Sequence, residues 1–543
     1  MLRRVTLGKR AGSLVVAQLA IAVAAVTTFA AFEGCGSSSA NNAAKPDGST
    51  GNGGDGGVPS VEASAEAAPV DAGPDCGAVP PTGTQLVPST DPLVILTLTA
   101  DHVIYENLTT QELYGVAIDG GTPSDIGKMQ SQGSTVWAHG STLLYMPVET
   151  DPMTGIGPVS SWTPTGGTTV VSTSAVAEDA YDYTYDVSKD GQWVAHYEAA
   201  ANAESAVLTV STIDGKTQMP LVTDVDLYDV DEQYMVILCN PPILQFVNDT
   251  LVAQFCKKES NDAGVTADED LVMAFTAPTF TPVLLGTYPV PRPDVELTPI
   301  VFDPTGTSAL LVDPSGVGLS LYPLAGGTPV VVDPTATAGL FASNGDILYT
   351  NSATSLVRYT AADGGTTTLV PSGLTLPLDL SPDGNWLQIA AGQSAGLTNL
   401  YLASATTPGP VNTVVKSETA GAIGFTASSA YSLYGTGFSD NFGPSTYTLW
   451  SSTIDGGATK VLSATGGSAV YATTGSKLVV PTNQTKSTGQ TDIVSVDVST
   501  TAAPTPLVTQ ADPNIFQTTS RAIVYSWYCN ESGTAGIWTL TPP

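Results

Sequence analysis

Residues 377–390 read PLDLSPDGNWLQIA, and this stretch decides the fold class. One short apolar segment, PLDL, ends at the turn Ser381-Pro382-Asp383-Gly384, and a second segment, NWLQIA, begins directly after it. Proline presets φ at the first turn position, aspartate caps the local amides, and glycine takes the positive φ. Two more strand-like segments follow, NLYL at 399–402 and VNTVV at 411–415, so we expect four strands in this unit.

A unit of this kind returns about ten times between Leu86 and Pro543, at spacings of about 45 residues. In each, an aromatic residue ends one strand, a turn of Asp-Gly-Gly type follows, and a Thr/Val/Leu strand comes next. Clear examples are Leu113-Tyr114 with Asp119-Gly120-Gly121, Leu321-Tyr322 with Ala325-Gly326-Gly327, and Leu449-Trp450 with Asp455-Gly456-Gly457. A period of roughly 40–50 residues built from short strands is typical of a β-propeller. No segment after Leu86 keeps a 3.6-residue apolar period, so we expect almost no helix.

The Ser-Pro-Asp-Gly turn recurs in altered form as SKDG at 188–191 and DPTG at 303–306. With this turn followed by an aromatic or aliphatic strand, the chain resembles the TolB-type, WD-repeat-like propellers. The resemblance implies a fold and not a function, because such propellers serve many roles. We therefore expect an all-β β-propeller of about ten four-stranded units (7–10 blades) over residues 84–543. One large ring, two smaller rings, and an eight-bladed ring with two units miscounted stay open.

The two ends of the repeat region look complementary. The last unit stops at Leu540 without a fourth strand, while residues 84–88 read TQLVP, close to TPLVT at 505–509 in the preceding unit. We expect this N-terminal strand to pair into the last blade and close the ring. Such pairing removes two free sheet edges at once.

Charge excludes one class of partner. The chain has 543 residues, 42% of them hydrophobic and 12% charged, with 17 basic and 50 acidic side chains and a formal charge of −33. Such a surface repels phosphate backbones and anionic headgroups, so we expect no nucleic-acid binding. We interpret the acidity as solubility in a salty compartment, with recruitment of cations or basic ligands as the alternative.

The N-terminus has the pattern of an export signal. A basic segment, 1–10, precedes an apolar run over 11–32, and FEGCG follows at 32–36. Cys35 resembles the lipidated cysteine of bacterial lipoproteins, although Phe32 and Glu33 depart from the family pattern. We expect a lipoprotein-type signal peptide over 1–34, with an uncleaved anchor helix and ordinary cleavage as alternatives.

A low-complexity segment separates the signal from the repeats. Residues 35–83 are rich in Ser, Asn, Gly, Ala, Pro and Asp, a composition that predicts a disordered tether. A cysteine followed by such a tether resembles the exposed lipoproteins of Gram-negative bacteria. The residue after Cys35 is not aspartate, which resembles lipoproteins sorted to the outer membrane. We therefore expect an outer-membrane lipoprotein of the cell envelope, on the periplasmic side or at the cell surface, that meets the membrane through its lipid only.

Without Cys35, four cysteines are left, an even number that favours disulfides in an oxidising compartment. Cys239 and Cys256 flank two neighbouring predicted strands. Cys76 comes just before the closing strand, and Cys529 lies in the last unit, so a bridge between them would lock the ring at its seam. Free buried thiols are the alternative.

The sequence contains few residues with catalytic potential. GQSAG at 392–396 matches a nucleophile-elbow string, but it lies between two strand-like segments and no histidine follows it. We interpret His102, His139 and His196 as structural, with a metal site of His139, His196 and a carboxylate as the alternative. We expect no cofactor and no catalytic residue.

Acidic residues form two dense runs that we interpret as solvated loops, with weak Ca²⁺ binding conceivable. The runs are Asp224, Asp226, Asp229, Asp231 and Glu232, and then Asp262, Asp268, Glu269 and Asp270.

These observations favour an exported, lipid-anchored, non-catalytic binding or scaffold module. We expect a protein, peptide or glycan of the cell envelope as its ligand, bound by loops on a stiff scaffold. A propeller lyase or hydrolase that uses carboxylates and a bound cation is one alternative. A structural envelope protein is the other.

Overall fold

A computed structural model describes most of residues 83–540. The parts of this range that it does not describe are 129–135, 148–155, 177–184, 200–204, 227–229, 232–235, 238–242, 261–265, 290–299, 314–317, 337, 375, 395–396, 419, 438–445, 456, 466–470, 483–490, 512–514, 518–522 and 530–533. Within the described residues every regular element is a β-strand, from β1 to β42. The all-β prediction is therefore confirmed. The predicted signal peptide and tether, with Cys35 and Cys76, lie outside the described residues.

The strands fall into consecutive groups of four, which we call units. Unit 1 contains β2 (Leu93–Leu98), β3 (His102–Asn107), β4 (Glu112–Ala117) and β5 (Ser124–Lys128). Unit 2 contains β6 (Val136–His139), β7 (Thr142–Tyr145), β8 (Ile156–Thr163) and β9 (Gly167–Val176). Unit 3 contains β10 (Tyr185–Val187), β11 (Trp193–Ala199), β12 (Ala206–Thr212) and β13 (Gln218–Asp226). The short pair β14 (Val230–Asp231) and β15 (Val236–Ile237) comes before unit 4, which contains β16 (Ile243–Val247), β17 (Thr250–Ser260), β18 (Thr266–Thr276) and β19 (Thr281–Pro289).

The second half of the chain repeats the pattern. Unit 5 contains β20 (Val301–Phe302), β21 (Ser308–Val312), β22 (Leu319–Pro323) and β23 (Val330–Asp333), and unit 6 contains β24 (Ala338–Phe341), β25 (Ile347–Thr350), β26 (Leu356–Thr360) and β27 (Gly365–Val370). Unit 7 contains β28 (Leu376–Leu380), β29 (Trp386–Ser394), β30 (Leu397–Ser404) and β31 (Asn412–Glu418). Unit 8 contains β32 (Ala420–Phe425), β33 (Tyr431–Thr436), β34 (Thr446–Thr453) and β35 (Ala458–Thr465). Unit 9 contains β36 (Tyr471–Ala472), β37 (Lys477–Thr482), β38 (Thr491–Asp497) and β39 (Thr505–Ala511), and unit 10 joins β1 (Thr84–Ser89) to β40 (Ile515–Gln517), β41 (Ile523–Cys529) and β42 (Thr534–Leu540).

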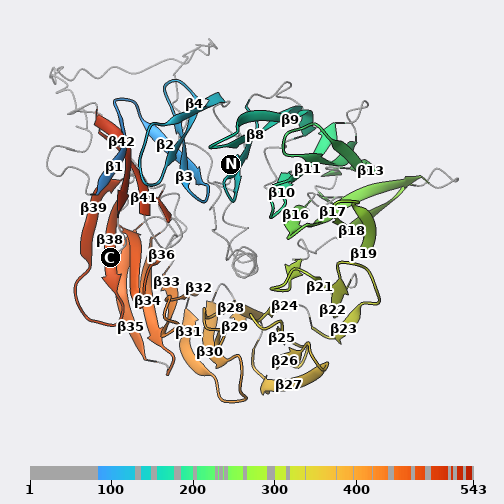
Figure 1. The fold of residues 1–543 in the computed structure, drawn as a ribbon. Helices are drawn as coiled ribbons and strands as arrows, with labels where there is room; N and C mark the ends of the chain where they lie inside the picture. The colour runs from blue at the N-terminus through green and yellow to red at the C-terminus, as the bar shows by residue number, and fades with distance from the viewer. Residues whose placement is uncertain are drawn as a thin grey trace, which may run out of the picture.

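Each unit is an antiparallel sheet, and the units follow one another around a common centre in chain order (Figure 1). Seven units form separate four-stranded sheets, whereas units 2, 3 and 4 are linked into one twelve-stranded sheet. The links are short: Glu198 of β11 pairs with Ala175 of β9, and β13 pairs with β17 at two positions. Within a strand, alternate residues are more deeply buried, as in β2, where Leu93, Ile95 and Thr97 point inward.

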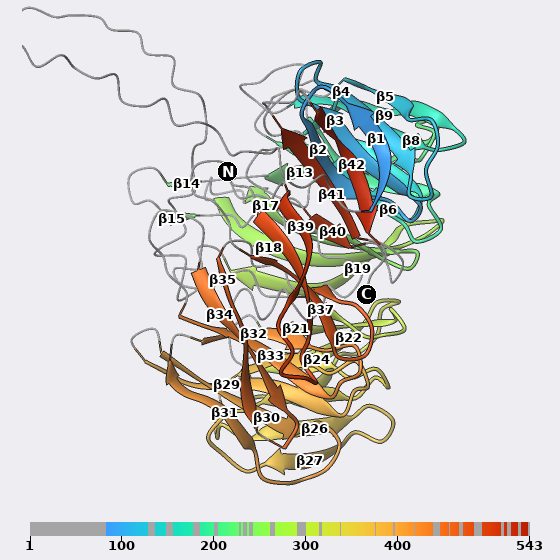
Figure 2. The same ribbon diagram turned by 90° about the vertical axis from the view of Figure 1, so that its left-hand side faces the viewer.

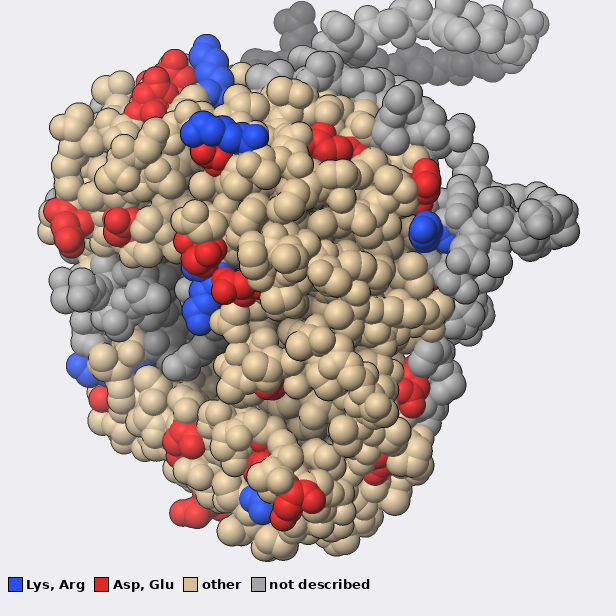
Figure 3. Space-filling model, turned by 45° about the vertical axis from the view of Figure 1, so that its right-hand side comes forward, with Lys and Arg blue, Asp and Glu red and all other residues tan. Residues whose placement is uncertain are grey.

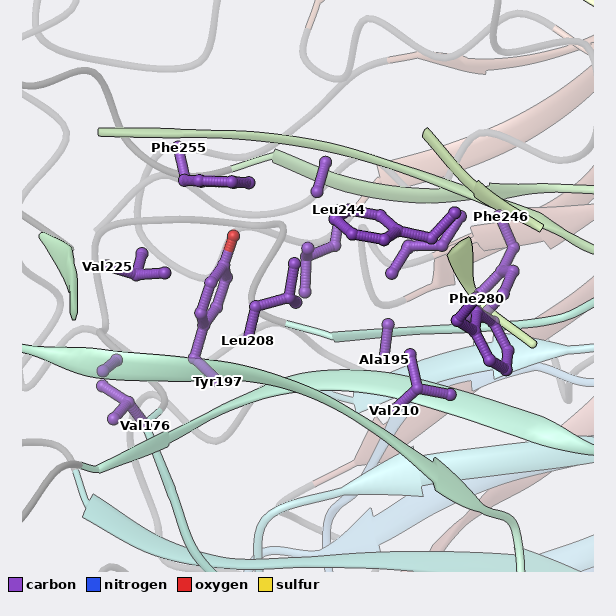
Figure 4. Close-up of a cluster of buried hydrophobic side chains, with 14 residues drawn as sticks. Val176, Ala195, Tyr197, Leu208, Val210, Val225, Leu244, Phe246, Phe255 and Phe280 are labelled. Carbon is purple, nitrogen blue, oxygen red and sulfur yellow. The ribbon is translucent and has the colours of Figure 1, made fainter. Parts of the chain in front are cut away.

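The hydrophobic core lies between neighbouring units. In the cluster between units 3 and 4, Tyr197 and Leu208 from unit 3 meet Leu244, Phe246 and Phe255 from unit 4 (Figure 4). Each sheet therefore buries apolar side chains on both faces, which explains why the strands read as dense Val/Leu/Ile segments.

The N-terminal strand lies in the last sheet, as residues 84–88 predicted. β1 pairs antiparallel with β42, with Val87 opposite Ile537. Figures 1 and 2 both show β1 beside β42, next to unit 1. Val103 of unit 1 belongs to the same buried cluster as Val524 and Ile537 of unit 10. The first and last units are thus in direct contact through their cores.

Hydrogen bonds also connect the turns that join the first two strands of successive units. The amide of Ala100 in unit 1 donates to the Gly140 carbonyl of unit 2 at 2.7 Å. The Asn248 side chain of unit 4 donates to the Thr305 carbonyl of unit 5 at 2.8 Å. Comparable bonds join unit 3 to unit 4 through Lys189 and Asn248, unit 7 to unit 8 through Asp383 and Ser429, and unit 8 to unit 9 through Ser428 and Gly475. We call this set of contacts the turn belt.

No helix in the described part of the chain has the length and apolar composition needed to cross a membrane.

Candidate functional site

A groove lies between the outermost strand of unit 4 and the outer half of unit 5. Its volume is about 360 Å³, within the range of small ligand-binding sites. One wall is the run 283–287 of β19. The other wall consists of Tyr322 and Pro323 at the end of β22, with Gly326, Gly327 and Pro329 from the turn that follows.

Local sequence explains the shape of this second wall. Gly326 and Gly327 have φ of +89° and +138°, values that L side chains rarely adopt, so the Gly-Gly pair allows the chain to turn sharply after β22. The position of a Cβ on Gly326 would lie 3.6 Å from the Val283 methyl groups. The turn therefore lies close to β19, and Gly326 and Gly327 line the groove.

In the part of the chain that the structure describes, the first wall is the edge of a sheet. β19 is the last strand in the order of its sheet and pairs on one side with β18. A β-bulge interrupts this pairing between Val272 and Met273, opposite Gly286 and Leu284. Leu285 lies in the core, 5% exposed, whereas the neighbouring Leu284 points to the other face and is 58% exposed.

Exposed apolar side chains concentrate around this groove. Five large hydrophobic residues are exposed among the described residues, and three of them lie on β19 and β23: Leu284, Val330 (45%) and Val331 (58%). The side of the molecule that carries these strands comes forward in Figure 3, where uncharged residues cover most of the surface and charged ones stand in small groups. Of these three residues Leu284 lines the groove, and an exposed large apolar side chain in a groove is a candidate contact for a partner.

The groove has few polar side chains. The hydroxyl groups of Thr287 and Tyr322 are the polar side-chain groups among the lining residues. Burial raises the pKa of Tyr322, and the negative charge of Asp313 acts in the same direction, so this hydroxyl keeps its proton at neutral pH. The groove therefore offers apolar contacts, backbone groups and neutral hydrogen-bond partners rather than acid–base chemistry.

A second distinctive site lies on the inner strands of units 2, 3 and 4. The carboxyl group of Asp186 accepts hydrogen bonds from Nε1 of Trp137 (3.0 Å), from the Val187 amide (2.8 Å) and from the Phe246 amide. Burial raises the pKa of Asp186 to about 7, against the lowering effect of these three donors. One side chain thus joins three successive units.

His196 lies beside Ser211 and Glu198, which are residue types of a catalytic triad, but its Nδ1 has no hydrogen-bond partner among the described residues. Its Nε2 lies 2.8 Å from the Ser211 hydroxyl, and its Nδ1 lies 3.5 Å from Glu198, which accepts a 2.6 Å bond from Ser174. His196 and Ser211 are both fully buried, and burial lowers the pKa of His196 to about 4, although Glu198 acts in the opposite direction. A nucleophile must reach its substrate. This arrangement holds β11 and β12 together and offers no surface for a substrate.

The other two histidines have different neighbours. His102 lies edge-on to the Trp162 ring, 5.6 Å between centroids, with Nδ1 3.0 Å from Asp101. His139 is the last residue of β6 and is half-buried. Among the described residues no three His, Cys, Asp or Glu side chains come together as metal ligands. The alternative metal site of His139 and His196 stays a prediction.

GQSAG lies at a strand–strand connection. Its first three residues end β29, and β30 begins at Leu397 directly after the motif. Ser394 pairs with Leu397 across this connection. A nucleophile elbow requires a strand, a sharp turn and a helix, so the structure supports a hairpin at this position.

The prediction that both acidic runs are solvated loops was wrong in part. Asp224 is exposed, but it belongs to β13, as does Asp226. In the second run, residues 268–270 lie in β18. Asp270 is 1% exposed, and its carboxyl group accepts a 2.8 Å hydrogen bond from the side-chain amide of Gln254. The reason is that β17 and β18 are both eleven residues long and their pairing continues through Ser260 and Thr266. Asp231 lies in β14, whereas Asp229, Glu232 and Asp262 are outside the described residues, and the side chains of Asp268 and Glu269 are not described.

Of the five cysteines, Cys256 is placed in full. It is buried in β17 and is disulfide-bonded. Cys239 lies outside the described residues, and the side chain of Cys529, at the end of β41, is also not described. The pairings of Cys239 with Cys256 and of Cys76 with Cys529 stay predictions.

Sequence reasoning missed both the groove and the Asp186 site. The Gly326-Gly327 turn was found as a turn, but Leu284 carries no local signal that it stays exposed. For Asp186 a signal exists, because 186–191 (DVSKDG) and 379–384 (DLSPDG) share Asp-x-Ser-x-Asp-Gly. Asp379 accepts a bond from the Leu380 amide at 2.9 Å, as Asp186 does from Val187.

Comparison with known proteins concerns the fold. No family model matches the chain, and no curated protein matches it. Similar solved structures include a eukaryotic initiation factor (10% identity, TM-score 0.44, 72% of this chain and 92% of that chain covered). They also include TolB from Acinetobacter baumannii (13% identity, TM-score 0.23, 54% of this chain and 81% of that chain covered). An oligogalacturonate lyase in complex with manganese is similar at 11% identity and a TM-score of 0.30, with 54% of this chain and 86% of that chain covered. The chain is thus an all-β protein whose structural neighbours include TolB and other propeller-like proteins.

Proposed function

We propose that this protein is a non-catalytic binding module whose groove between β19 and the turn after β22 holds a protein, peptide or glycan of the cell envelope. The observation that carries the proposal is Leu284, a large apolar side chain that stays 58% exposed beside a free strand edge. Leaving such a residue in water gives up roughly 1.5–3 kcal/mol of burial. A partner that covers it recovers part of that free energy.

The scaffold in this proposal is a single closed ring of ten units, with β1 completing the tenth. The pairing of β1 with β42 and the shared core of Val103, Val524 and Ile537 support the closure. Turn-belt bonds between successive units support a stiff ring. A stiff scaffold lowers the conformational entropy lost when a ligand binds.

The proposal also places the ring outside the cytoplasm, at the outer membrane. A lipid on Cys35 would hold the protein, and the segment 36–83 would act as a spacer between membrane and ring. The mass of the N-terminal peptide from the native membrane fraction tests this part. An acylated Cys35 supports it, and an intact Met1 contradicts it.

Photo-crosslinking in the native cells tests the groove. Benzoylphenylalanine is placed at position 284 or, as the control, at position 331 of the full chain. Val331 is equally exposed (58%), lies on the neighbouring edge strand β23, and is not among the groove-lining residues. We expect a discrete adduct from position 284 and little from position 331. Absence of an adduct at 284, or equal adducts at both positions, would contradict binding in the groove.

A further inference from the structure

We propose that the groove binds an extended, uncharged segment of a partner polypeptide, which adds to β19 as a further antiparallel or parallel strand. This inference rests on the proposed binding function and narrows its ligand to one class. Strand addition to a free sheet edge is a general mode of peptide recognition, with affinity from main-chain hydrogen bonds and specificity from side-chain contacts.

The direction of the groove supports strand addition. All five consecutive residues of the run 283–287 line it, so the groove follows β19 along its length instead of crossing it. β19 ends the order of its sheet among the described residues, so the outward backbone N–H and C=O groups of the run 283–287 face the groove. A peptide laid in the groove would satisfy these groups in the regular ladder pattern.

The opposite wall also favours pairing of the peptide with β19. Pro323 and Pro329 have no backbone N–H, and the turn at Gly326 and Gly327 is not extended backbone. This wall is therefore a poor strand partner and a good apolar surface. A peptide between the two walls would pair with β19 on one edge and pack side chains against Tyr322 and the prolines on the other.

Charge restricts the occupant further. The lining residues include no acidic or basic side chain, so a charged residue in the middle of the segment would be desolvated without a partner. The whole chain carries a formal charge of −33, which repels acidic partners over several ångströms and favours neutral or basic flanks.

Two other occupants, a second copy of the chain and a glycan, fit the groove less well. A second copy of the chain would bring its own formal charge of −33, and the two copies would repel each other. A glycan presents many hydroxyl groups, whereas Thr287 and Tyr322 are the polar side chains among the lining residues. An extended polypeptide segment with apolar or small side chains fits better than either.

The probe for this inference is the fluorescein-labelled heptapeptide Lys-Val-Thr-Val-Thr-Val-Lys, titrated with the purified full chain and followed by fluorescence anisotropy. The first comparison peptide has every internal backbone nitrogen methylated, which removes its N–H donors. The second has Glu in place of both Lys residues. We expect saturable binding of the Lys peptide and weaker binding of both comparison peptides, by about tenfold or more.

Two neutral variants locate the binding. Leu284→Gln should lower the affinity for the Lys peptide by about tenfold, because the variant loses the apolar contact of one leucine. Val331→Gln, a matched change at an equally exposed residue, should leave affinity within about twofold. Both positions are exposed, so both variants should keep the unfolding midpoint of the wild type, which circular dichroism measures.

The inference is overturned if the Lys peptide does not bind, if its methylated twin binds as tightly, or if Val331→Gln loses as much affinity as Leu284→Gln. An adduct at position 284 in cells, together with failure of the peptide series, would leave a binding groove whose ligand is not a strand. Failure of both experiments would remove the binding function as well.

Discussion

Asp186 is the residue at which burial and hydrogen bonding compete most directly. Three N–H donors surround its carboxyl group, an arrangement that stabilises the ionised form, yet complete burial raises its pKa to about 7. The donors come from units 2, 3 and 4, and this carboxyl group therefore connects the inner strands of three units. Its equivalent in unit 7, Asp379, lies so close to unit 8 that the position of a Cβ on Gly424 would be 3.0 Å from Oδ2.

The raised pKa predicts a pH-dependent contribution to stability. Because the folded-state pKa of Asp186 (about 7) exceeds its ordinary value of 3.8, the folded protein binds more protons between these values. The contribution is therefore present in full below pH 4 and is lost as pH rises through 7. The advantage of the wild type over Asp186→Asn in free energy of unfolding should shrink over this window, by an amount of the order of 4 kcal/mol at most.

Thermal or denaturant unfolding of both proteins at several pH values between 4 and 8.5 measures this difference. The buried His196 titrates in both proteins, so its opposite contribution cancels. Asp119→Asn, at an exposed turn, is the control and should not change the midpoint. A wild-type advantage that stays constant with pH would show that the three donors fully offset the cost of burying the charge.

At the scale of the element, the first turns that take part in the turn belt have two roles. Asn248 illustrates this, because its φ of +56° is tolerated by asparagine and its side chain bonds to both neighbours. Its Oδ1 accepts from Nζ of Lys189 at 3.0 Å, and its Nδ2 donates to the Thr305 carbonyl at 2.8 Å. The residue that makes the turn therefore also ties unit 4 to units 3 and 5.

Two substitutions separate these roles. Asn248→Gly keeps the left-handed backbone and removes both side-chain bonds, so it should destabilise the protein by about 1 kcal/mol. Asn248→Ala removes the same bonds and adds backbone strain, which should cost about 1 kcal/mol more. Amide hydrogen exchange over 188–192 and 303–307 should rise in both variants. Wild-type exchange in Asn248→Gly would mean that these bonds do not hold the turns together.

At the scale of the whole molecule, β1 decides whether the chain ends are free or joined. The approach of β1 to β42 is close enough that a Cβ on Gly536 would overlap the Val87 carbonyl. Val87 is 6% exposed and packs in the core that units 1 and 10 share. Through this one strand, apolar burial and ladder hydrogen bonds both act between the two ends of the chain.

Val87→Asp should therefore loosen the contact between the first and last units. Burying an unpaired carboxylate costs several kcal/mol, so β1 should leave the sheet instead. We expect faster hydrogen exchange over 534–540 and a lower unfolding midpoint. Thr84→Asp, at an exposed position of the same strand, adds the same charge and is the control. Exchange over 534–540 that stays unchanged in Val87→Asp would contradict a joining role for β1.

The strands, their grouping and many of the turns could be predicted from local sequence patterns. The turn Ser381-Pro382-Asp383-Gly384 forms where it was predicted, with Ser381 and Asp383 bonded at 2.6 Å, because its interactions lie within a few residues. The placement of β1 was also predictable, since residues 84–88 repeat the pattern of an outer strand. These features depend on local dihedral preferences and on alternation of apolar residues, both of which a sequence displays directly.

Which residues are exposed at the groove, and which polar groups are buried, depends on how the units pack in three dimensions. Leu284 and Leu285 are adjacent and identical in type, yet the first is exposed and the second is buried, because the packing of units 4 and 5 determines which face of β19 meets the core. Asp186 and Asp270 look like ordinary acidic residues until neighbouring strands enclose them. Burial is set by how units some 45 residues apart pack together, and no local pattern in the chain records that packing.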